Sequence, residues 1–375
     1  MEHKTLLLID GNAIVYRSFH GIPALKTKEG VQVNAVYGFV SSILAAIKLF
    51  HPEYLAVAFD VGKKTFRNDQ YKEYKANRVK MPDELAAQLP LVKEVCKVMN
   101  IPQFGVKNFE ADDVIGTITE KISAYAKALA DKQYLNDKKN SRHSELVSES
   151  RDSVSDCFTS VRNDIEVIIV TGDMDTLQLV NDNVSVYSVS RGIKRAEIFN
   201  EQKVQQKYGF ASQYLIDYKG LRGDPSDNIP GVPGIGEVTA KKLIKEFGNI
   251  ENLYSKILNF KTQILNKIPN SNNKKNNCHS ELVSESQRSR NKFGMTSCIK
   301  PKTIDLLLKH KEQAFLSKSL ATIKKDVPLD FRLADTRLSD YNQEKVIKLF
   351  QQLEFKSLIA KLPDAKATTV QKSLF

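Results

Sequence analysis

Three short apolar segments of this chain each run directly into aspartate. The segments are Lys4–Ile9, Tyr54–Phe59 and Ile165–Val170, and the acids that follow them are Asp10, Asp60, Asp173 and Asp175. Continuous apolar runs of this length are typical of strands buried on both faces in a parallel sheet. The carboxyl ends of neighbouring parallel strands open onto one crevice, where ligands bind. The pattern therefore predicts an α/β fold that brings these aspartates together.

A further acidic cluster, Glu110, Asp112 and Asp113, precedes a helical pattern of apolar residues that begins at Val114. The dipole at a helix N-terminus favours negative charge, so capping alone is the simplest interpretation of this cluster. The aspartates at the strand ends favour a second interpretation, because so many carboxylates in one place cannot stay ionised without a counter-charge. Oxygen ligands without His or Cys favour Mg²⁺ or Mn²⁺ over zinc.

The composition is that of a globular protein with two or three domains. The chain has 375 residues, 41% of them hydrophobic, and no apolar run long enough to cross a membrane. The N-terminus lacks the features of a signal peptide, and the four cysteines show no metal-ligand spacing, so we expect a cytoplasmic protein with free thiols. A net charge of +12 around an acidic centre suits an enzyme that acts on a phosphate polymer.

The segment Gly62–Lys80 combines seven Lys or Arg residues with interleaved aromatic residues, against two acidic residues. Five of its residues recur at helical spacing and are predicted to share one face: Arg67, Tyr71, Tyr74, Lys75 and Arg78. A run of charge is usually only a solvated surface. Cations that bind phosphates beside rings that stack on bases are, however, the combination that suits single-stranded nucleic acid.

A second functional region follows at 211–268. Asp224 and Asp227 lie three residues apart in a turn, and Ile229–Gly236 then leads into a predicted helix, Glu237–Phe247. A turn of glycine, hydrophobic residue and glycine between helices is typical of a helix-hairpin-helix, whose backbone N–H groups bind phosphate. An ordinary Gly/Pro loop is the alternative. The predicted DNA-binding residues here are Gly231, Gly234, Gly236, Lys241 and Lys242.

Two polar segments carry the same octapeptide, at His143–Ser150 and His279–Ser286. Two copies so far apart are not a solenoid, and we interpret them as copies of one element inserted in surface loops. The predicted organisation begins with an α/β core at 1–210, which includes a basic arch at 62–100 and an inserted loop at 136–163. A hairpin subdomain at 211–268, a low-complexity insertion at 270–300, a helical segment at 301–362 and a flexible tail at 363–375 follow it.

Several long motifs resemble the 5′-nuclease family, most closely the N-terminal 5′→3′ exonuclease region of bacterial DNA polymerase I. The matching stretches are LLLIDGNAIVYRSFH, AVAFD, KTFR with YKEYKANR, FEADDVIG, VTGDMDTLQLV and GLRGDPSDNIPGVPGIGEVTAKKL. The resemblance implies a mostly parallel central sheet flanked by helices, with a PIN or 5′-nuclease-like fold, a helical arch and a helix-hairpin-helix. Met174 and Val238 stand where relatives commonly carry Lys.

The resemblance also implies roles for individual residues. Asp10, Asp60, Glu110, Asp112 and Asp113 resemble the ligands of one metal ion, and Asp173, Asp175, Asp224 and Asp227 those of a second. Lys75 and Arg78 resemble the basic pair that grips the scissile phosphate and are included in the catalytic set. The hairpin resembles an element that holds duplex DNA, in some relatives with a K⁺ ion.

The function implied is a structure-specific 5′→3′ exonuclease or 5′-flap endonuclease that uses two Mg²⁺ or Mn²⁺ ions, in Okazaki-fragment processing and DNA repair. Its partners would be DNA with 5′ ends, flaps or nicks. The alternatives are a non-catalytic DNA-binding remnant of a polymerase and a phosphatase of the haloacid dehalogenase type. The second lacks support, because Asp10-Gly11-Asn12 has no acid two residues after the aspartate.

The last five residues, Gln371–Phe375, resemble the short peptides with which replication proteins bind a sliding clamp. Two adjacent apolar side chains can fill a pocket while a flexible tether keeps their effective concentration high. A chance match of so few residues is the alternative. We expect a monomer that associates with the nucleoid and not with a membrane.

Overall fold

The computed structural model describes residues 4–62, 64–141, 165–189, 196–265, 299–338 and 341–363. The chain divides into two compact units. Unit 1 consists of Met1–Phe66, Val79–Lys203 and Ile323–Phe375, and unit 2 consists of Arg67–Arg78 and Val204–Thr322. No helix within the described ranges has the length and apolar character needed to cross a membrane. The tail residues Gln371–Phe375 and both octapeptides lie outside the described residues.

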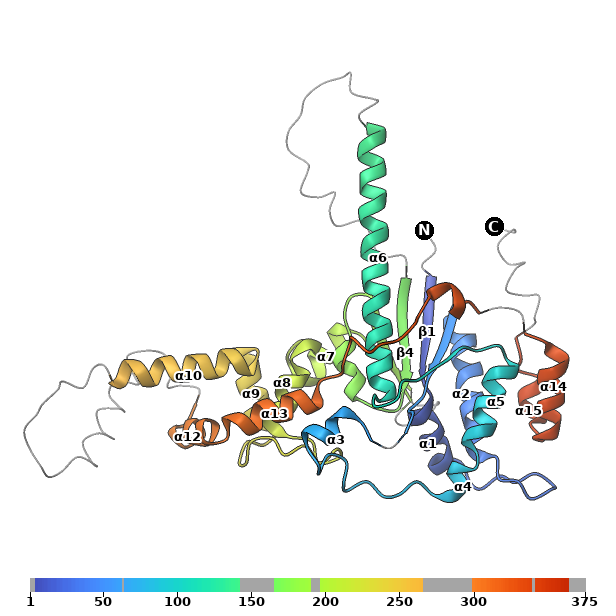
Figure 1. Ribbon diagram of the computed structural model, residues 1–375, viewed down its shortest axis with the longest axis horizontal. Helices are drawn as coiled ribbons and strands as arrows, with labels where there is room; N and C mark the ends of the chain where they lie inside the picture. The colour runs from blue at the N-terminus through green and yellow to red at the C-terminus, as the bar shows by residue number, and fades with distance from the viewer. Residues whose placement is uncertain are drawn as a thin grey trace, which may run out of the picture. The chain divides into compact units, whose positions relative to one another are not determined.

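Unit 1 is built on a sheet with the strand order β3-β2-β1-β4-β5-β6, in which β6 pairs antiparallel and the other described pairings are parallel (Figure 1). The strands are β1 (Lys4–Asp10), β2 (Tyr54–Ala58), β3 (Gln103–Phe104), β4 (Ile165–Thr171), β5 (Val184–Ser188) and β6 (Glu197–Phe199). The three apolar runs are thus the adjacent strands β2, β1 and β4, which confirms the predicted mostly parallel sheet. The sequence analysis did not identify β3, β5 or β6, which are shorter or carry more polar residues.

Helices cover both faces of this sheet. They are α1 (Gly11–Gly21), α2 (Asn34–Phe50), α4 (Asp83–Ala86), α5 (Leu89–Val98), α6 (Ala111–Ser141), α14 (Gln343–Gln352) and α15 (Lys356–Ile359), with 3₁₀ turns η2 (Asp175–Leu179) and η5 (Leu333–Thr336). Leu7 and Ile9 of β1 face a core shared with α1, α2, α5 and α14. Their neighbours Leu6 and Leu8 point to the opposite face, where α6 packs against β1, β2 and β4.

The first two turns of α6 hold the segment that follows residue 322. Asp113 Oδ1 accepts a hydrogen bond from the Lys324 amide at 2.8 Å, and Thr117 Oγ1 accepts one from the Val327 amide at 3.1 Å. Gly116 lies between them, and a Cβ there would come within 2.9 Å of the Lys324 carbonyl oxygen. These contacts hold 323–327 outside any helix, with a bend at Lys325, so the prediction of helix throughout 302–362 is wrong in this part.

Two other predicted helices have different bounds in the structure. The helix that begins after Glu110 was expected to end near Leu135, but α6 continues to Ser141 and so includes the first six residues of the expected inserted loop. The stretch 81–100 is not one helix, because the chain breaks between α4 and α5 at Ala87 and Gln88. The predicted helices at 33–50 and Glu237–Phe247 are confirmed as α2 and α9.

Unit 2 is helical. Its elements are α8 (Leu215–Arg222), α9 (Glu237–Phe247), α10 (Ile250–Leu265), α12 (Pro301–Lys309), α13 (Lys311–Ala321), most of α7 (Glu201–Tyr208) and α3 (Phe66–Gln70), and the 3₁₀ turn η4 (Ser212–Tyr214). Lys318 of α13 joins α8 to α10, because its Nζ lies 2.6 Å from Asp217 Oδ1 and 2.8 Å from Glu251 Oε2. Asp217 Oδ1 also accepts the Ile250 amide, so a buried carboxylate fixes the start of α10.

We predict that Gly116→Ala destabilises unit 1 by about 1–3 kcal/mol, because the added methyl meets main chain that cannot move aside. Gly21→Ala is the matched control, since nothing lies within 4 Å of a Cβ placed there. Urea unfolding followed by circular dichroism measures both variants. Equal stability of the two would show that α6 and 323–327 are not closely packed in solution.

Candidate active site

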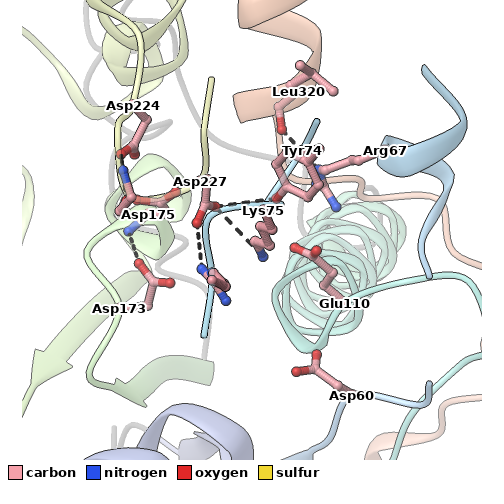
Figure 2. Close-up of polar contacts among 12 residues, drawn as sticks. Asp60, Arg67, Tyr74, Lys75, Glu110, Asp173, Asp175, Asp224, Asp227 and Leu320 are labelled. Atoms are coloured by element: carbon pink, nitrogen blue, oxygen red, sulfur yellow. Dashed lines mark hydrogen bonds and ion pairs between the residues drawn. The ribbon is translucent and has the colours of Figure 1, made fainter. Parts of the chain in front are cut away.

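The acidic residues predicted from the strand ends lie at one edge of the sheet of unit 1. β1 pairs in parallel with β2 and β4, with Asp10 opposite Ala58 and Ile9 opposite Val170. The residues that follow these strands therefore emerge at the same edge. Figure 2 shows Asp60 and Glu110 facing the same space. The predicted adjacency of these strand ends is confirmed, and the gathering of all these carboxylates into one site stays a prediction.

Asp10 is the most buried of the strand-end carboxylates, with 4% of its surface exposed. Oδ1 accepts the Ala13 amide at 3.0 Å and so caps α1, and Oδ2 accepts the Thr171 hydroxyl at 2.7 Å. Burial and, to a lesser extent, the charges of Asp60 and Asp173 raise the pKa of Asp10 to about 7, although the hydrogen bonds from Ala13 and Thr171 lower it. A nearby cation would therefore favour the ionised form of Asp10.

Main-chain hydrogen bonds hold the neighbouring acids. Asp60 Oδ1 accepts the Ala111 amide at 2.7 Å, which places Asp60 at the N-terminus of α6. Asp173 Oδ1 accepts the Asp175 amide at 2.9 Å, and this contact shapes the turn that leads into η2. Capping was posed as the alternative for Glu110, Asp112 and Asp113, and the structure shows it for Asp113, whose Oδ2 accepts the Glu110 amide.

Two polar residues that the sequence analysis did not single out position these acids. The Thr171 hydroxyl donates to Asp10 and accepts the Asp173 amide at 2.9 Å, so it links the ends of β1 and β4. Asn12 Oδ1 accepts the Asp60 amide at 3.0 Å. A Thr or Asn directly beside a strand-end aspartate is the only sequence signal for this role, and it is a weak one.

Asp113 differs from the other acids because both of its oxygens bind main-chain amides. Oδ1 accepts Lys324 N, Oδ2 accepts Glu110 N at 3.1 Å, and the side chain is fully buried. This carboxylate closes the first turn of α6 and anchors the segment after residue 322. Glu110 and Asp112, which flank it, are only half-buried.

The carboxylates of unit 1 have the chemistry of a site for hard divalent cations, since their donors are oxygens and Asp10 is buried among like charges. Among the described residues, no three His, Cys, Asp or Glu side chains are close enough together to hold a metal ion. Asp10, Asp60 and Asp173 each accept a hydrogen bond from a main-chain amide. The donor type and charge of these acids fit a divalent metal.

Asp224 and Asp227 lie in unit 2, where each has basic partners. Asp224 Oδ2 lies 2.7 Å from Lys219 Nζ, and Oδ1 accepts the Ser226 amide and hydroxyl. Burial alone would raise the pKa of Asp224, but the charge of Lys219 and these hydrogen bonds outweigh it and lower that pKa. Asp227 Oδ1 lies 2.5 Å from Arg78 Nη2, and Oδ2 lies 3.7 Å from Lys75 Nζ.

The predicted shared helical face of the basic segment is wrong. The helix α3 ends at Gln70, and Lys75 has a φ of 57°, so turns and not a helix connect these residues. Arg67 is 2% exposed, and its guanidinium donates to the carbonyl oxygens of Leu320 and Thr322. Tyr74 is 4% exposed. Arg67 and Tyr74 are therefore core residues of unit 2, and neither presents its side chain to a nucleic acid.

The glycines between α8 and α9, in the predicted hairpin, differ in role. Gly231 is buried against Gly223, where a Cβ would lie 2.2 Å from the Gly223 amide nitrogen, and its own N–H donates to Ser317 Oγ. Gly234 and Gly236 are exposed, and nothing lies within 4 Å of a Cβ on Gly236. The backbone open to a phosphate is therefore that of Gly234 and Gly236, while Gly231 is needed for packing.

The lysines of α9 also differ. Lys241 Nζ lies 2.7 Å from Glu237 Oε1 and 5.6 Å from the centre of the Tyr208 ring. Lys242 is exposed. In the first turn of the same helix, Val238 has 83% of its surface exposed.

Two family models match this chain. The model described as the 5′-3′ exonuclease, N-terminal resolvase-like domain, matches residues 5–136, and the model described as the 5′-3′ exonuclease, C-terminal SAM fold, matches residues 210–344. DNA polymerase I of Bacillus caldotenax is 33% identical over 96% of this chain and 32% of its own length. DNA polymerase I of Bacillus subtilis is 33% identical over 99% of this chain and 33% of its own length. The chain thus spans about a third of the length of these relatives.

Solved structures share the fold. The bacteriophage T5 5′-exonuclease with bound zinc has a TM-score of 0.55 at 19% identity, over 94% of this chain and 99% of its own. The catalytic core of Rad2 in complex with DNA has a TM-score of 0.50 at 13% identity, over 96% of this chain and 94% of its own. At these identities the likeness shows the fold alone.

We predict that Asp10→Asn stabilises the metal-free protein by an amount that grows as pH rises from 4 to 8. A carboxyl with a raised folded-state pKa holds a proton that the unfolded chain releases, so stability falls between the unfolded pKa, near 3.8, and about 7. The amide removes this loss. Thermal midpoints in EDTA measure the effect, with the exposed Asp182→Asn as control. A gain of the same size at every pH would contradict the burial of an ionisable Asp10.

Proposed function

Because the chain belongs to the 5′-3′ exonuclease family, we propose that it is a divalent-metal-dependent nuclease that hydrolyses DNA phosphodiester bonds at 5′ ends, flaps and nicks. The observation that carries the proposal is the buried Asp10 carboxyl beside Asp60 and Asp173 at the strand ends. A protein that only bound DNA would gain nothing from an acidic edge that repels phosphate. This argues against the alternative of a non-catalytic remnant.

We assign two Mg²⁺ or Mn²⁺ ions to this function. Bound metal would supply Lewis acidity to the scissile phosphate and lower the pKa of an attacking water. Within unit 1, Asp10, Asp60, Glu110 and Asp112 are the proposed ligands of one ion, and Asp173 and Asp175 are proposed for the other. For Asp224 and Asp227 the ligand role follows from the family motif. Asp113, with both oxygens on amides, is proposed to orient the start of α6 rather than to contact metal directly.

The basic residues would hold the DNA. Lys75 and Arg78 are proposed to bind the backbone of the 5′ strand, and Tyr71 is a half-buried aromatic residue of the same segment. The hairpin is proposed to bind duplex through its exposed backbone at Gly234 and Gly236 and through Lys242, without reading sequence. We further propose that the hairpin binds a K⁺ ion and that the protein is a monomer. Its proposed role is in Okazaki-fragment processing and DNA repair at the nucleoid.

Binding of a sliding clamp by Gln371–Phe375 remains a separate proposal from the sequence. Its support is the pairing of Gln with two adjacent apolar side chains in a polar tail. Calorimetry of the 363–375 peptide against a bacterial clamp tests it, with Leu374→Ala plus Phe375→Ala as the control peptide. Equal binding by the two peptides, or none by either, would refute it.

We predict that Asp175→Asn lowers the rate of 5′-flap cleavage by at least about a hundredfold and leaves flap binding within about twofold. A metal ligand acts on charge that develops in the transition state, whereas the grip on duplex comes from the basic surface. Single-turnover cleavage in Mg²⁺ and binding in EDTA separate the two effects. Asp182→Asn, an exposed change of the same kind, is the control. Near-normal turnover of Asp175→Asn would refute the assignment of this edge as the active site.

We also predict that Val238→Lys tightens duplex binding several-fold and steepens the dependence of log K on log salt concentration by about 0.9, the value for one added phosphate contact. Val238 is exposed in the first turn of α9, beside the open glycines. Leu49→Lys adds the same charge on α2, at an exposed position outside the hairpin, and is the matched control. Equal slopes for the two variants would show that this turn does not contact the DNA backbone.

A further inference from the structure

The carboxylate of Asp227 occupies a site built from cations and a hydroxyl. Arg78 Nη2 lies 2.5 Å from Oδ1, Lys75 Nζ lies 3.7 Å from Oδ2, and the Tyr74 hydroxyl donates to Oδ2 at 3.4 Å. Figure 2 shows the carboxylate turned toward Lys75 and Tyr74. The Asp227 side chain is 8% exposed, so the anion is nearly enclosed. The site has the composition of an oxyanion-binding site, and at present a side chain of the same unit fills it.

Main-chain contacts hold this site in shape independently of the ion pairs. The Lys75 amide donates to the Asp227 carbonyl oxygen at 2.9 Å. Asn77 Nδ2 donates to the Pro225 carbonyl and Asn228 Nδ2 donates to the Glu73 carbonyl, each at 2.7 Å. These bonds join the turn at 73–78 to the turn at 225–228, so the backbone that carries both cations would stay in place if the carboxylate rotated away.

A carboxylate and a phosphodiester compete for the same donors. Both are oxyanions, and the guanidinium fork of Arg binds either of them. The Arg78 side chain is 51% exposed and that of Lys75 is 22% exposed, so an incoming phosphate can reach Arg78 from solvent. Exchange keeps the cations paired, because one oxyanion replaces another. The free-energy cost of the exchange is that the Asp227 carboxylate loses its contacts with Arg78, Lys75 and Tyr74.

We propose that Asp227 is an internal competitor for the DNA backbone, and that a phosphate of the 5′ strand binds Lys75 and Arg78 by displacing its carboxylate. This rests on the proposed function, in which these cations grip DNA. Displacement frees Asp227 for the metal role that the family motif implies. A phosphate on the cations and a metal ion on Asp227 each remove one side of the ion pair, so each raises the affinity for the other. The ion pair would thus couple DNA binding to metal binding.

The test measures binding without metal and without cleavage. Asp227→Asn keeps the shape and removes the competing charge, and Glu251→Gln is the matched control because Glu251 is an acid of the same unit that pairs with Lys318 instead. Fluorescence anisotropy in EDTA with a labelled 5′-phosphorylated single strand gives the affinities. We expect Asp227→Asn to bind about fivefold or more tightly than the unmodified protein and Glu251→Gln to bind within about twofold of it. Equal gains in both variants would show a general charge effect and overturn the proposal.

A double-mutant cycle adds the second criterion. The gain from Asp227→Asn should vanish in a protein that also carries Lys75→Ala and Arg78→Ala, because the competitor then has nothing to release. A gain that persists without the two cations, or no gain at all, would overturn the proposal. Limited trypsin digestion after Lys75 and Arg78, compared between the unmodified protein and Asp227→Asn, shows whether the segment keeps its fold. If neither the unmodified protein nor any variant bound DNA, the proposed function would be refuted together with this proposal. If the unmodified protein binds and cleaves flaps while Asp227→Asn shows no gain in affinity, only the proposal that Asp227 competes with DNA is refuted.

Discussion

Repulsion among the carboxylates at the ends of β1 and its neighbours is the constraint on which unit 1 depends. Parallel pairing puts the ends of β1, β2 and β4 side by side, so acids after these strands cannot avoid one another. Burial of Asp10 makes its ionisation unfavourable, and the nearby acids add to this. The protein offsets the cost with helix N-termini and hydroxyls, since Asp10 caps α1 and Asp60 caps α6. Helix starts therefore serve both the fold and the proposed chemistry.

The parts of the fold that the sequence could predict are those determined by local pattern. Continuous apolar runs identified β1, β2 and β4, and the glycine spacing identified the turn before α9. The parts that it could not predict depend on contacts between distant segments. Asp113 was expected to bind metal from its motif alone, but its role as an anchor needs Lys324, more than 200 residues away. The non-helical course of 323–327 has the same origin.

The basic segment shows why side-chain type does not determine exposure. Arg67, Tyr74 and Lys75 were grouped because their spacing fits a helix, and that spacing is meaningful only while the helix continues. The left-handed conformation at Lys75 ends any regular face. Arg67 is then held by the carbonyls of α13 and its C-terminus, a partner that sequence periodicity cannot reveal. Of the five residues assigned to one surface, two belong to the core of unit 2 and two pair with Asp227.

The hydrogen bonds between α6 and the segment after residue 322 show that unit 1 depends on residues that are synthesised late. Unit 1 is assembled from three stretches of sequence, and its core includes Val346 and Phe350 of α14. During synthesis, all of the proposed ligands leave the ribosome before these residues do. The core of unit 1 is therefore complete only after all of unit 2 has been translated. A chain released before residue 323 would carry every acid of the proposed active site and still lack the part of the core that α14 supplies to β1.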